Sequence, residues 1–497
     1  MPADTLVPSA VASYEAVIGI EVHCQLKTAS KMFCGCSTAY DGAAPNTHVC
    51  PVCLGLPGAL PVINKRAVEL VLATGAALGS TTPDHTRWDR KNYFYPDLPK
   101  GYQISQYDLP LAAGGSLTFD TADGPFTVEI TRAHLEEDTA KLVHAPGPDG
   151  RPLSLVDYNR SGAPLMEIVT EPDIRTAEQA RRYAEELQLL LRTIGASDAD
   201  MERGQMRVEA NVSLRPVGTE AFGTRVEVKN MNSFRSVEHA IAFEIERQAA
   251  ELDAGRALVM ETRGWADDRA ETYRMRGKET SDDYRYFPEP DLPPLRVDPA
   301  WLSQIRAALP MLPSERRIVY TEDPTYRLTP LEADILVGDA DAARLFEATL
   351  AAGRGNDGRS IAGWVLGEYL RLRNAADHPV TVDPRELALL ARLTTEGSIS
   401  RANAKQVFEA HVNTGAGVSA IVAEKGFHQI SDEGALGAIV DEVIADNPAA
   451  VADVRAGKSQ AIGFLVGKVM QATKGQANAA VVQATLRERL RGEDDGG

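Results

Sequence analysis

The sequence lacks the short motifs that mark the commonest nucleotide-binding and hydrolytic enzymes. It contains no GxxxxGK(S/T) loop, no GxSxG elbow and no HExxH helix. A P-loop NTPase and an ordinary hydrolase are therefore disfavoured. Long hydrophobic runs are missing too, because apolar stretches such as Ala67–Ala77 are interrupted by charge or too short to span a bilayer.

Positive charge is scarce over most of the chain. The 52 Lys and Arg are outnumbered by 70 Asp and Glu, and the formal net charge is -18. This balance argues against indiscriminate nucleic-acid binding, because neutralising phosphates needs clustered basic side chains. The exception is a basic stretch near the C-terminus that contains one acid, Glu488, and comprises Arg455, Lys458, Lys468, Lys474, Arg487, Arg489 and Arg491. From its residues alone, this stretch is either a solvated helical surface or a local RNA-binding surface.

The N-terminal residues carry no targeting signal. Met1–Ser13 (MPADTLVPSAVAS) has neither a basic segment nor an apolar segment after it, so it is not a secretory signal peptide. We expect these residues to form a disordered leader and the protein to be cytoplasmic. A large cytosolic protein rarely carries disulfides, so we expect no disulfide framework among the five cysteines.

The 497 residues are too many for one compact core and predict about three domains. The first 295 residues are rich in strand-type alternation, and the proline-rich Leu292–Pro299 marks a boundary. Helical, Ala-rich patterning follows, with a second break at Thr395–Ser400. We therefore predict an α+β protein with a β-rich antiparallel domain at 14–295, a helical domain at 296–398 and a small all-α tail at 399–492.

Three segments predict half-buried antiparallel strands, because apolar and polar residues alternate along them: Val17–Leu26, Arg207–Leu214 and Arg225–Lys229. One helix is equally clear, since Thr176 and Gln179 form a capping box and Gly195 is a typical stop.

The polar faces of these strands are rich in acids. If the strands are neighbours, Glu21, His23, Glu209 and Glu227 converge. Carboxylates gathered in this way need a cation, and oxygen ligands favour Mg²⁺, which in turn points to nucleotide phosphates. Arg132–Lys141 (RAHLEEDTAK) adds three consecutive acids beside two bases, as phosphoryl transfer requires. The alternative is an ordinary solvated strand face.

Four of the cysteines are closely spaced. Cys34-x-Cys36 and Cys50-x₂-Cys53 fit a tetrahedral Zn²⁺ site, with unrelated thiols as the alternative. His48 is a substitute ligand in this pattern, whereas Cys24 falls on the apolar face of its strand.

Two loops, Tyr93–Pro99 (YFYPDLP) and Tyr284–Pro294 (YRYFPEPDLPP), combine aromatic residues with proline. They are either two lips of one cleft or rigid loops that pack their rings. Exposed aromatic loops suit base stacking, which favours the cleft.

At this point a family resemblance becomes visible. The chain resembles the B subunit of the bacterial aspartyl/glutamyl-tRNA amidotransferase family over nearly all of its first domain. The matching phrases are Val17–Leu26 (VIGIEVHCQL), Asp89–Gln106 (DRKNYFYPDLPKGYQISQ), His134–Lys141 (HLEEDTAK), Leu155–Asp173 (LVDYNRSGAPLMEIVTEPD), Arg207–Pro216 (RVEANVSLRP), Val226–Phe234 (VEVKNMNSF) and Ser281–Pro294 (SDDYRYFPEPDLPP).

The resemblance implies a function in two steps. ATP phosphorylates the side-chain carboxylate of Glu-tRNA(Gln), Asp-tRNA(Asn) or both, and ammonia then displaces phosphate. The ammonia comes from glutamine through a glutaminase A subunit, and a small C subunit completes a heterotrimer. The expected architecture is a cradle domain with the kinase site, a helical domain and a tail that contacts tRNA.

The resemblance also implies roles for particular residues. The family's Mg²⁺ positions fall on Glu21, His23, Glu137 and Glu227, whereas Glu209 rests on the strand pattern alone. The remaining expected contacts with ATP, substrate or the tRNA acceptor end are Lys229, Asn230, Arg160, Tyr93, Tyr95 and Tyr286. In the tail, Arg455, Lys458, Lys468 and Lys474 are expected to contact the tRNA backbone. The four cysteines are variable in the family, so zinc is expected to be structural rather than catalytic.

Two other functions remain open at this point. A non-catalytic, zinc-containing tRNA-binding scaffold would keep activity without the carboxylates. A free-standing ligase for a small carboxylate would act without tRNA and without partner subunits.

Overall fold

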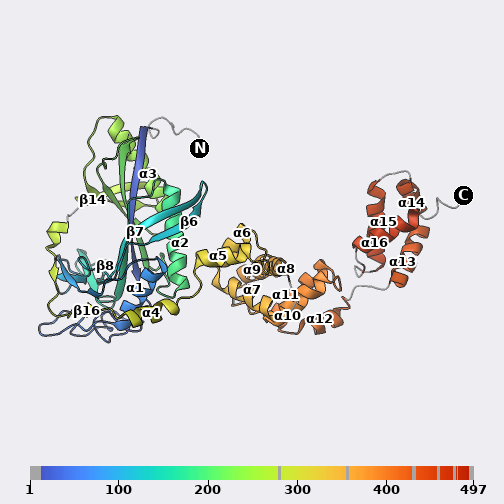
Figure 1. The fold of residues 1–497 in the computed structure, drawn as a ribbon, viewed down its shortest axis with the longest axis horizontal. Coiled ribbons are helices and arrows are strands. Elements are labelled where there is room, and N and C mark those ends of the chain that lie inside the picture. Colours follow the sequence, from blue (N-terminus) through green and yellow to red (C-terminus); the bar gives the residue numbers. More distant parts are fainter. Residues whose placement is uncertain are drawn as a thin grey trace. The chain divides into compact units, whose positions relative to one another are not determined.

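The computed structural model describes residues 13–277, 281–353, 357–427, 433–455, 459–473, 477 and 479–491 (Figure 1). The predicted leader therefore lies outside the described residues, apart from Ser13. The chain divides into two compact units, Met1–Ser314 and Glu315–Gly497. The first unit ends later than the predicted boundary at Leu295, because helix α4 (Pro299–Ala307) packs on α1 (Lys65–Ala77).

A nine-stranded sheet organises the first unit. Its strand order is β14-β13-β12-β11-β1-β10-β7-β5, and β6 also pairs with β7. All of these neighbours are antiparallel except β12 and β13. The strands are β1 (Tyr14–Gln25), β5 (Ala112–Ala113), β6 (Ser116–Thr121), β7 (Gly124–Glu137), β10 (Pro164–Thr170), β11 (Met206–Pro216), β12 (Val226–Met231), β13 (Glu261–Ala266) and β14 (Glu271–Gly277).

The three strands predicted from alternation are β1, β11 and β12, and they are direct neighbours. Their apolar face is buried in a core shared with α1, α2 (Ala177–Thr193) and α3 (Phe234–Asp253), and α3 packs directly on β11 and β12. The capping box of Thr176 and Gln179 is present at the start of α2, and Gly195 follows its end with a positive φ of 70°. Because the helices cover the apolar face, the acidic face of the same strands is left to line a cleft.

Smaller strand pairs surround the sheet. They are β3 (Asp89–Asn92) with β4 (Tyr102–Ser105) and β15 (Phe287–Pro288), β2 (His85–Thr86) with β16 (Leu295–Arg296), and the hairpin β8 (Lys141–Pro146) and β9 (Pro152–Asp157). The pairing of β15 with β3 brings the two aromatic loops side by side, and the ring centroids of Tyr93 and Tyr284 are 6.1 Å apart.

The second unit is helical in its described parts. It contains α5 (Pro313–Glu322), α6 (Pro330–Gly338), α7 (Ala340–Ala352), α8 (Gly358–Trp364), the π-helix η3 (Val365–Tyr369), α9 (Leu370–Ala375), α10 (Pro384–Thr395), α11 (Arg401–Thr414) and α12 (Val418–Lys425), followed by α13 (Glu433–Asp446), α14 (Pro448–Arg455), α15 (Ser459–Ala472) and α16 (Ala479–Arg491). Helices α13 to α16 enclose a core of their own that includes Leu436, Leu465 and Leu486.

The predicted fold class is thus confirmed: an antiparallel-rich sheet domain precedes an all-α region. The break expected at Thr395–Ser400 coincides with the turn between α10 and α11. However, α11 and α12 pack on α10, so the self-contained tail core begins at α13 rather than at residue 399. No helix in the described parts of the chain is both long and apolar enough to cross a membrane.

Candidate active site

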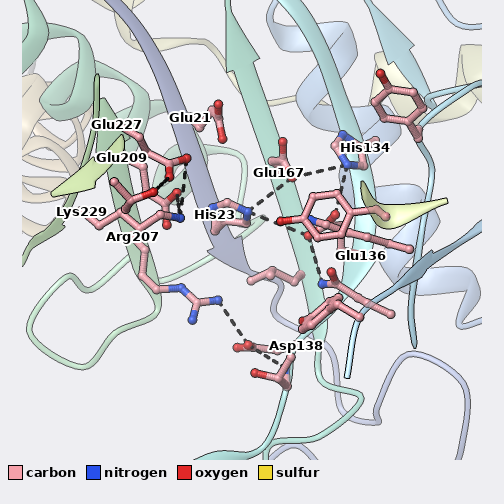
Figure 2. Close-up of a pocket in the computed structure, with 18 of the residues that line it drawn as sticks. Glu21, His23, His134, Glu136, Asp138, Glu167, Arg207, Glu209, Glu227 and Lys229 are labelled. Carbon is pink, nitrogen blue, oxygen red and sulfur yellow. Dashed lines mark hydrogen bonds and ion pairs between the residues drawn. The ribbon is translucent and has the colours of Figure 1, made fainter. Parts of the chain in front are cut away.

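The polar face of the sheet forms the floor of a cleft of about 630 Å³ (Figure 2). Its floor comes from β1, β7, β10, β11 and β12, and the aromatic loops contribute to its wall. Two groups of acids lie on this floor. Each brings three ligand atoms within 4.8 Å of one another, which is the spacing of a metal site.

The first group, the histidine–glutamate cluster, consists of His23, Glu136 and Glu167. Strand register assembles it, because Glu167 lies opposite His23 on β1 and opposite His134 on β7. The His23 Nε2 atom is 3.3 Å from Glu167 Oε2 and 3.9 Å from Glu136 Oε2. The His134 Nε2 atom lies 3.5 Å from Glu136 and 3.6 Å from Glu167.

Neighbouring charges favour the imidazolium form of His23 and the carboxylate form of Glu167. Burial opposes the imidazolium of His23, but the hydrogen bond and charge of Glu167, with the charges of Glu209 and Glu136, raise its pKa to about 9. Burial likewise opposes the carboxylate of Glu167, yet the neighbouring histidines hold its pKa well below the usual value. The cluster therefore concentrates negative charge that a nearby cation stabilises.

The second group, the triple-glutamate cluster, consists of Glu21, Glu209 and Glu227. Glu21 lies opposite Glu209 in the register of β1 and β11. The Lys229 Nζ atom lies 2.5 Å from Glu209 Oε2 and 3.8 Å from Glu227 Oε1. The charges of those two glutamates overcome burial and raise the Lys229 pKa. The Lys229 ammonium thus lies beside two of the three carboxylates.

Neutral donors also contact Glu21 and Glu227. Asn211 Nδ2 donates to Glu21 Oε1 at 2.7 Å, and Thr262 Oγ1 donates to Glu227 Oε2 at 2.6 Å.

Basic side chains ring both clusters. Lys91 is half-buried, and the charge of Glu136 outweighs its desolvation and keeps its pKa well above the usual value. Arg132 Nη2 lies 3.8 Å from Glu167, and Arg207 Nη2 lies 3.2 Å from Asp138. A cleft that combines carboxylates with Lys and Arg can hold both a metal and phosphate oxygens.

The structure brings most of the predicted site residues together. Glu21, His23, Glu209, Glu227, Lys229, Tyr93 and Tyr286 line the cleft. Tyr284 lines it as well, so the two aromatic loops share the cleft and pack their rings against each other.

Glu137 does not join them. Successive residues of β7 point to opposite faces, so Glu136 and Asp138 line the cleft while Glu137 faces a separate cavity of about 230 Å³. There Glu137 accepts hydrogen bonds from Lys100 Nζ at 2.8 Å and Ile104 N at 2.9 Å. The structure therefore places Glu137 away from Glu21, His23 and Glu227, whereas Glu136 lies in the cleft beside His23.

Three other predicted contacts lie outside the cleft lining. Arg160 donates to the carbonyl oxygens of Thr139 and Ala140 at 2.9 and 3.0 Å. Asn230 Nδ2 donates to the Tyr273 hydroxyl at 3.2 Å. Tyr95 is 57% exposed.

The sequence reasoning also missed Glu167, His134 and Lys91, which line the cleft. A signal existed for Glu167, since it is the single acid within the apolar strand PLMEIVT. A lone carboxylate in a buried strand needs a hydrogen-bond donor or a positive charge beside it.

The Sγ atoms of Cys34, Cys36, Cys50 and Cys53 also lie within 4.8 Å of one another. All five cysteines are free thiols, and Cys24 is buried in the core as expected. A hydrogen bond with Cys34, helped by the backbone of Cys50 and the charge of Lys31, lowers the Cys53 pKa to about 4. This cluster is separate from the cleft, and its thiols can act together as metal ligands.

Part of the predicted tRNA-binding surface lies within the described residues. Arg455 is exposed at the end of α14, and Lys468 is half-buried on α15. Arg487 and Arg489 are exposed on α16. Lys458 and Lys474 lie outside the described residues.

The family models that match this chain define its class as a GatB/GatE-type catalytic domain followed by a GatB domain. Residues 16–303 match the family model of the GatB/GatE catalytic domain, and residues 344–490 match that of the GatB domain.

The names of similar proteins identify the family within this class. Relatives named as the B subunit of an aspartyl/glutamyl-tRNA(Asn/Gln) amidotransferase include that of Moorella thermoacetica, 52% identical over 96% of this chain and 100% of the relative. Those of Thermomicrobium roseum and Anaeromyxobacter sp. are 52% and 48% identical over 96% and 97% of this chain, and each is covered over 99% of its length. The chain belongs to this family of amidotransferase B subunits.

Proposed function

We propose that this chain is the carboxylate-activating subunit of a tRNA-dependent amidotransferase. Its substrates are ATP and a tRNA that carries Glu in place of Gln, or Asp in place of Asn. The observation that carries the proposal is the pair of acidic clusters ringed by Lys and Arg within one cleft. Family membership supplies the reaction class.

The donor atoms suit Mg²⁺. The histidine–glutamate cluster offers one imidazole and two carboxylates, and the triple-glutamate cluster offers three carboxylates against one lysine. Carboxylate oxygens gathered at this spacing favour a bound divalent cation. Bound there, Mg²⁺ supplies charge neutralisation for the phosphate oxygens.

The chain's own residues bind and orient the two reacting anions. Lys91, Arg132 and Lys229 point positive charge into the cleft and reduce the repulsion between ATP and the substrate carboxylate. A carboxylate oxygen attacks the γ-phosphorus, the bond to ADP breaks, and an acyl phosphate forms. Ammonia then attacks the acyl carbon, and the phosphate leaves with the former carboxylate oxygen.

Ammonia must be supplied from outside this chain, in which we find no glutaminase motif. We infer a heterotrimer with a glutaminase A subunit and a small C subunit, acting in the cytoplasm. The three-part division into a kinase domain, a helical domain and a tail belongs to the same proposal.

The cysteine cluster fits a structural Zn²⁺. A tetrahedron with Zn–S bonds of about 2.3 Å places its sulfurs about 3.8 Å apart. The Sγ atoms of Cys50 and Cys53 are 3.8 Å apart. Its thiols lie outside the cleft lining, which supports a structural rather than catalytic role.

The tail supports tRNA binding through its exposed arginines. Arg455, Arg487 and Arg489 provide positive charge for the phosphate backbone, with Lys458, Lys468 and Lys474 completing the predicted surface.

The test is phosphate release by the chain co-purified with its partner subunits. We expect release from ATP only when misacylated tRNA is present. Activity that survives substitution of both clusters would support the scaffold function, and activity on free glutamate without tRNA would support the free-standing ligase.

A further inference from the structure

Two polar side chains of β4 lie against the end of β7, beside the carboxylate of Glu136. They belong to Gln103 and Ser105, which are 5% and 1% exposed. Alternate residues of a strand point to the same side, so the two side chains reach Glu136 together while Ile104 points away. Buried polar groups in folded proteins have hydrogen-bond partners, and here the shared partner is one carboxylate.

Each side chain donates to a different oxygen of Glu136. Ser105 Oγ lies 2.8 Å from Oε1, and Gln103 Nε2 lies 3.1 Å from Oε2. Gln103 Nε2 also donates to the carbonyl oxygen of Glu137 at 2.8 Å, which orients the amide because only its NH₂ group can serve two acceptors. Since an ionised carboxylate accepts and does not donate, rotation of the Glu136 carboxylate away from this position would break both bonds.

The two contacts hold Glu136 turned toward the other members of its cluster (Figure 2). The oxygen bound by Gln103, Oε2, is the one that lies 3.9 Å from His23 Nε2. Each carboxylate oxygen can accept a further partner through its second lone pair, so these donors leave room for a metal ion. Hydrogen bonds to ligating carboxylates are a general means of orienting metal ligands.

The alternative is that these contacts only fasten β4 to β7. The structure supplies that attachment through other bonds, which do not involve the Glu136 carboxylate. The Ile104 N atom donates to Glu137 Oε1 at 2.9 Å, and the Leu135 N atom donates to Gln106 Oε1 at 3.0 Å. Gln106 is buried and directly follows β4, but it binds the backbone of β7. It is therefore a matched example of a purely structural role.

We propose that Gln103 and Ser105 are positioning residues, which hold the Glu136 carboxylate in the orientation that binds the metal ion. This inference rests on the proposed function, because it requires that the histidine–glutamate cluster binds Mg²⁺. Both residues act through Glu136 rather than as ligands. Loss of either donor frees the carboxylate to rotate and lowers the affinity of the cluster for the metal, although every ligand is still present.

The test measures Mn²⁺ binding by EPR on the full complex, together with thermal unfolding of the same samples. Ser105→Ala removes only a hydroxyl group, and Gln103→Met removes the amide at similar side-chain length. Each should weaken Mn²⁺ binding about ten-fold, a typical cost of losing a hydrogen-bond partner of a metal ligand. Gln106→Met is the matched control, which should lower Tm and bind Mn²⁺ as the wild type does.

A double-mutant cycle separates positioning from general destabilisation. In Glu136→Ala the carboxylate is gone and His23 and Glu167 retain weaker binding, so adding Ser105→Ala should cause no further loss of Mn²⁺ affinity. An equal loss with and without the carboxylate would overturn the inference, as would wild-type affinity in both single variants. Either result would leave the proposed function intact. Failure of the wild-type complex to bind Mn²⁺ would instead overturn the proposed metal site, and this inference with it.

Discussion

The acidic cleft and the cysteine cluster both gather anionic ligands at metal-binding distance, but different backbones present them. Five neighbouring strands carry the cleft ligands, so register sets their spacing. The cysteines lie in the segment between β1 and α1, where turns rather than a strand ladder set their positions. The cleft ligands are oxygens and an imidazole surrounded by cations, whereas the cysteine ligands are four sulfurs. The difference matches the two roles that we propose, phosphate chemistry for the cleft and a structural metal for the cysteine cluster.

The largest expected effect is in the cleft. Glu136→Gln should lower kcat for amidation by roughly 10²–10³-fold, the usual cost of removing one electrostatic stabiliser. Mn²⁺ binding, followed by EPR, should weaken in parallel. Glu129→Gln on the same strand is the control, because Glu129 is exposed. If Glu137→Gln abolished Mn²⁺ binding and Glu136→Gln did not, the assignment of Glu136 rather than Glu137 to the metal site would be wrong.

Substitutions in the cysteine cluster should lower stability and leave catalysis unchanged. Cys53→Ser should remove bound zinc and lower Tm, because metal-binding free energy contributes to folding, while kcat of the folded protein stays unchanged. Metal analysis and thermal unfolding measure both effects. Cys24→Ala is the control, since Cys24 lies outside the cluster, and it should retain zinc. Loss of kcat without loss of Tm would give zinc a catalytic role and break the comparison.

A pH dependence sharpens the contrast further. The metal-free His23 pKa is raised to about 9, so its imidazolium persists through neutral pH. A metal must displace that proton, and its affinity should therefore rise by up to about tenfold per pH unit and level off above pH 9. Mn²⁺ titrations from pH 7 to pH 9.5 test this. His23→Gln should abolish the dependence, and a flat wild-type profile would remove His23 from the metal site.

The smallest effect is expected in the tail, which we propose binds tRNA without taking part in chemistry. Replacing Arg487 and Arg489 by Ala should raise the KM for tRNA several-fold and leave kcat unchanged. Each lost phosphate contact should reduce the salt slope of binding by about one. Arg344→Ala, an exposed arginine on α7, is the control. An unchanged salt slope in the double variant would place the tRNA contact elsewhere.

The triple-glutamate cluster could be predicted because its strands alternate cleanly. β1, β11 and β12 each bury one apolar face, so the acids on the opposite face converge once the strands pair. The cysteine cluster was equally visible, since its spacing is local. In both cases the signal lies within short stretches of sequence.

The histidine–glutamate cluster could be predicted only in part. Residues Ala133 to Glu137 of β7 are all buried, so alternation does not reveal which of two consecutive glutamates faces the cleft. Glu167 lies in a strand that is buried on both faces, where no polar periodicity exists. Lys91 comes from a separate small sheet, and its approach to Glu136 depends on tertiary packing.

The central claim is that ATP phosphorylates the substrate carboxylate in this cleft. The most direct measurement uses misacylated tRNA in which both side-chain carboxylate oxygens are ¹⁸O, with the full complex, ATP and glutamine. We predict that ¹⁸O appears in inorganic phosphate, one atom for each amide formed, and that Glu136→Gln suppresses both products together. Amide formation with unlabelled phosphate would show that the carboxylate is not phosphorylated and would contradict the account.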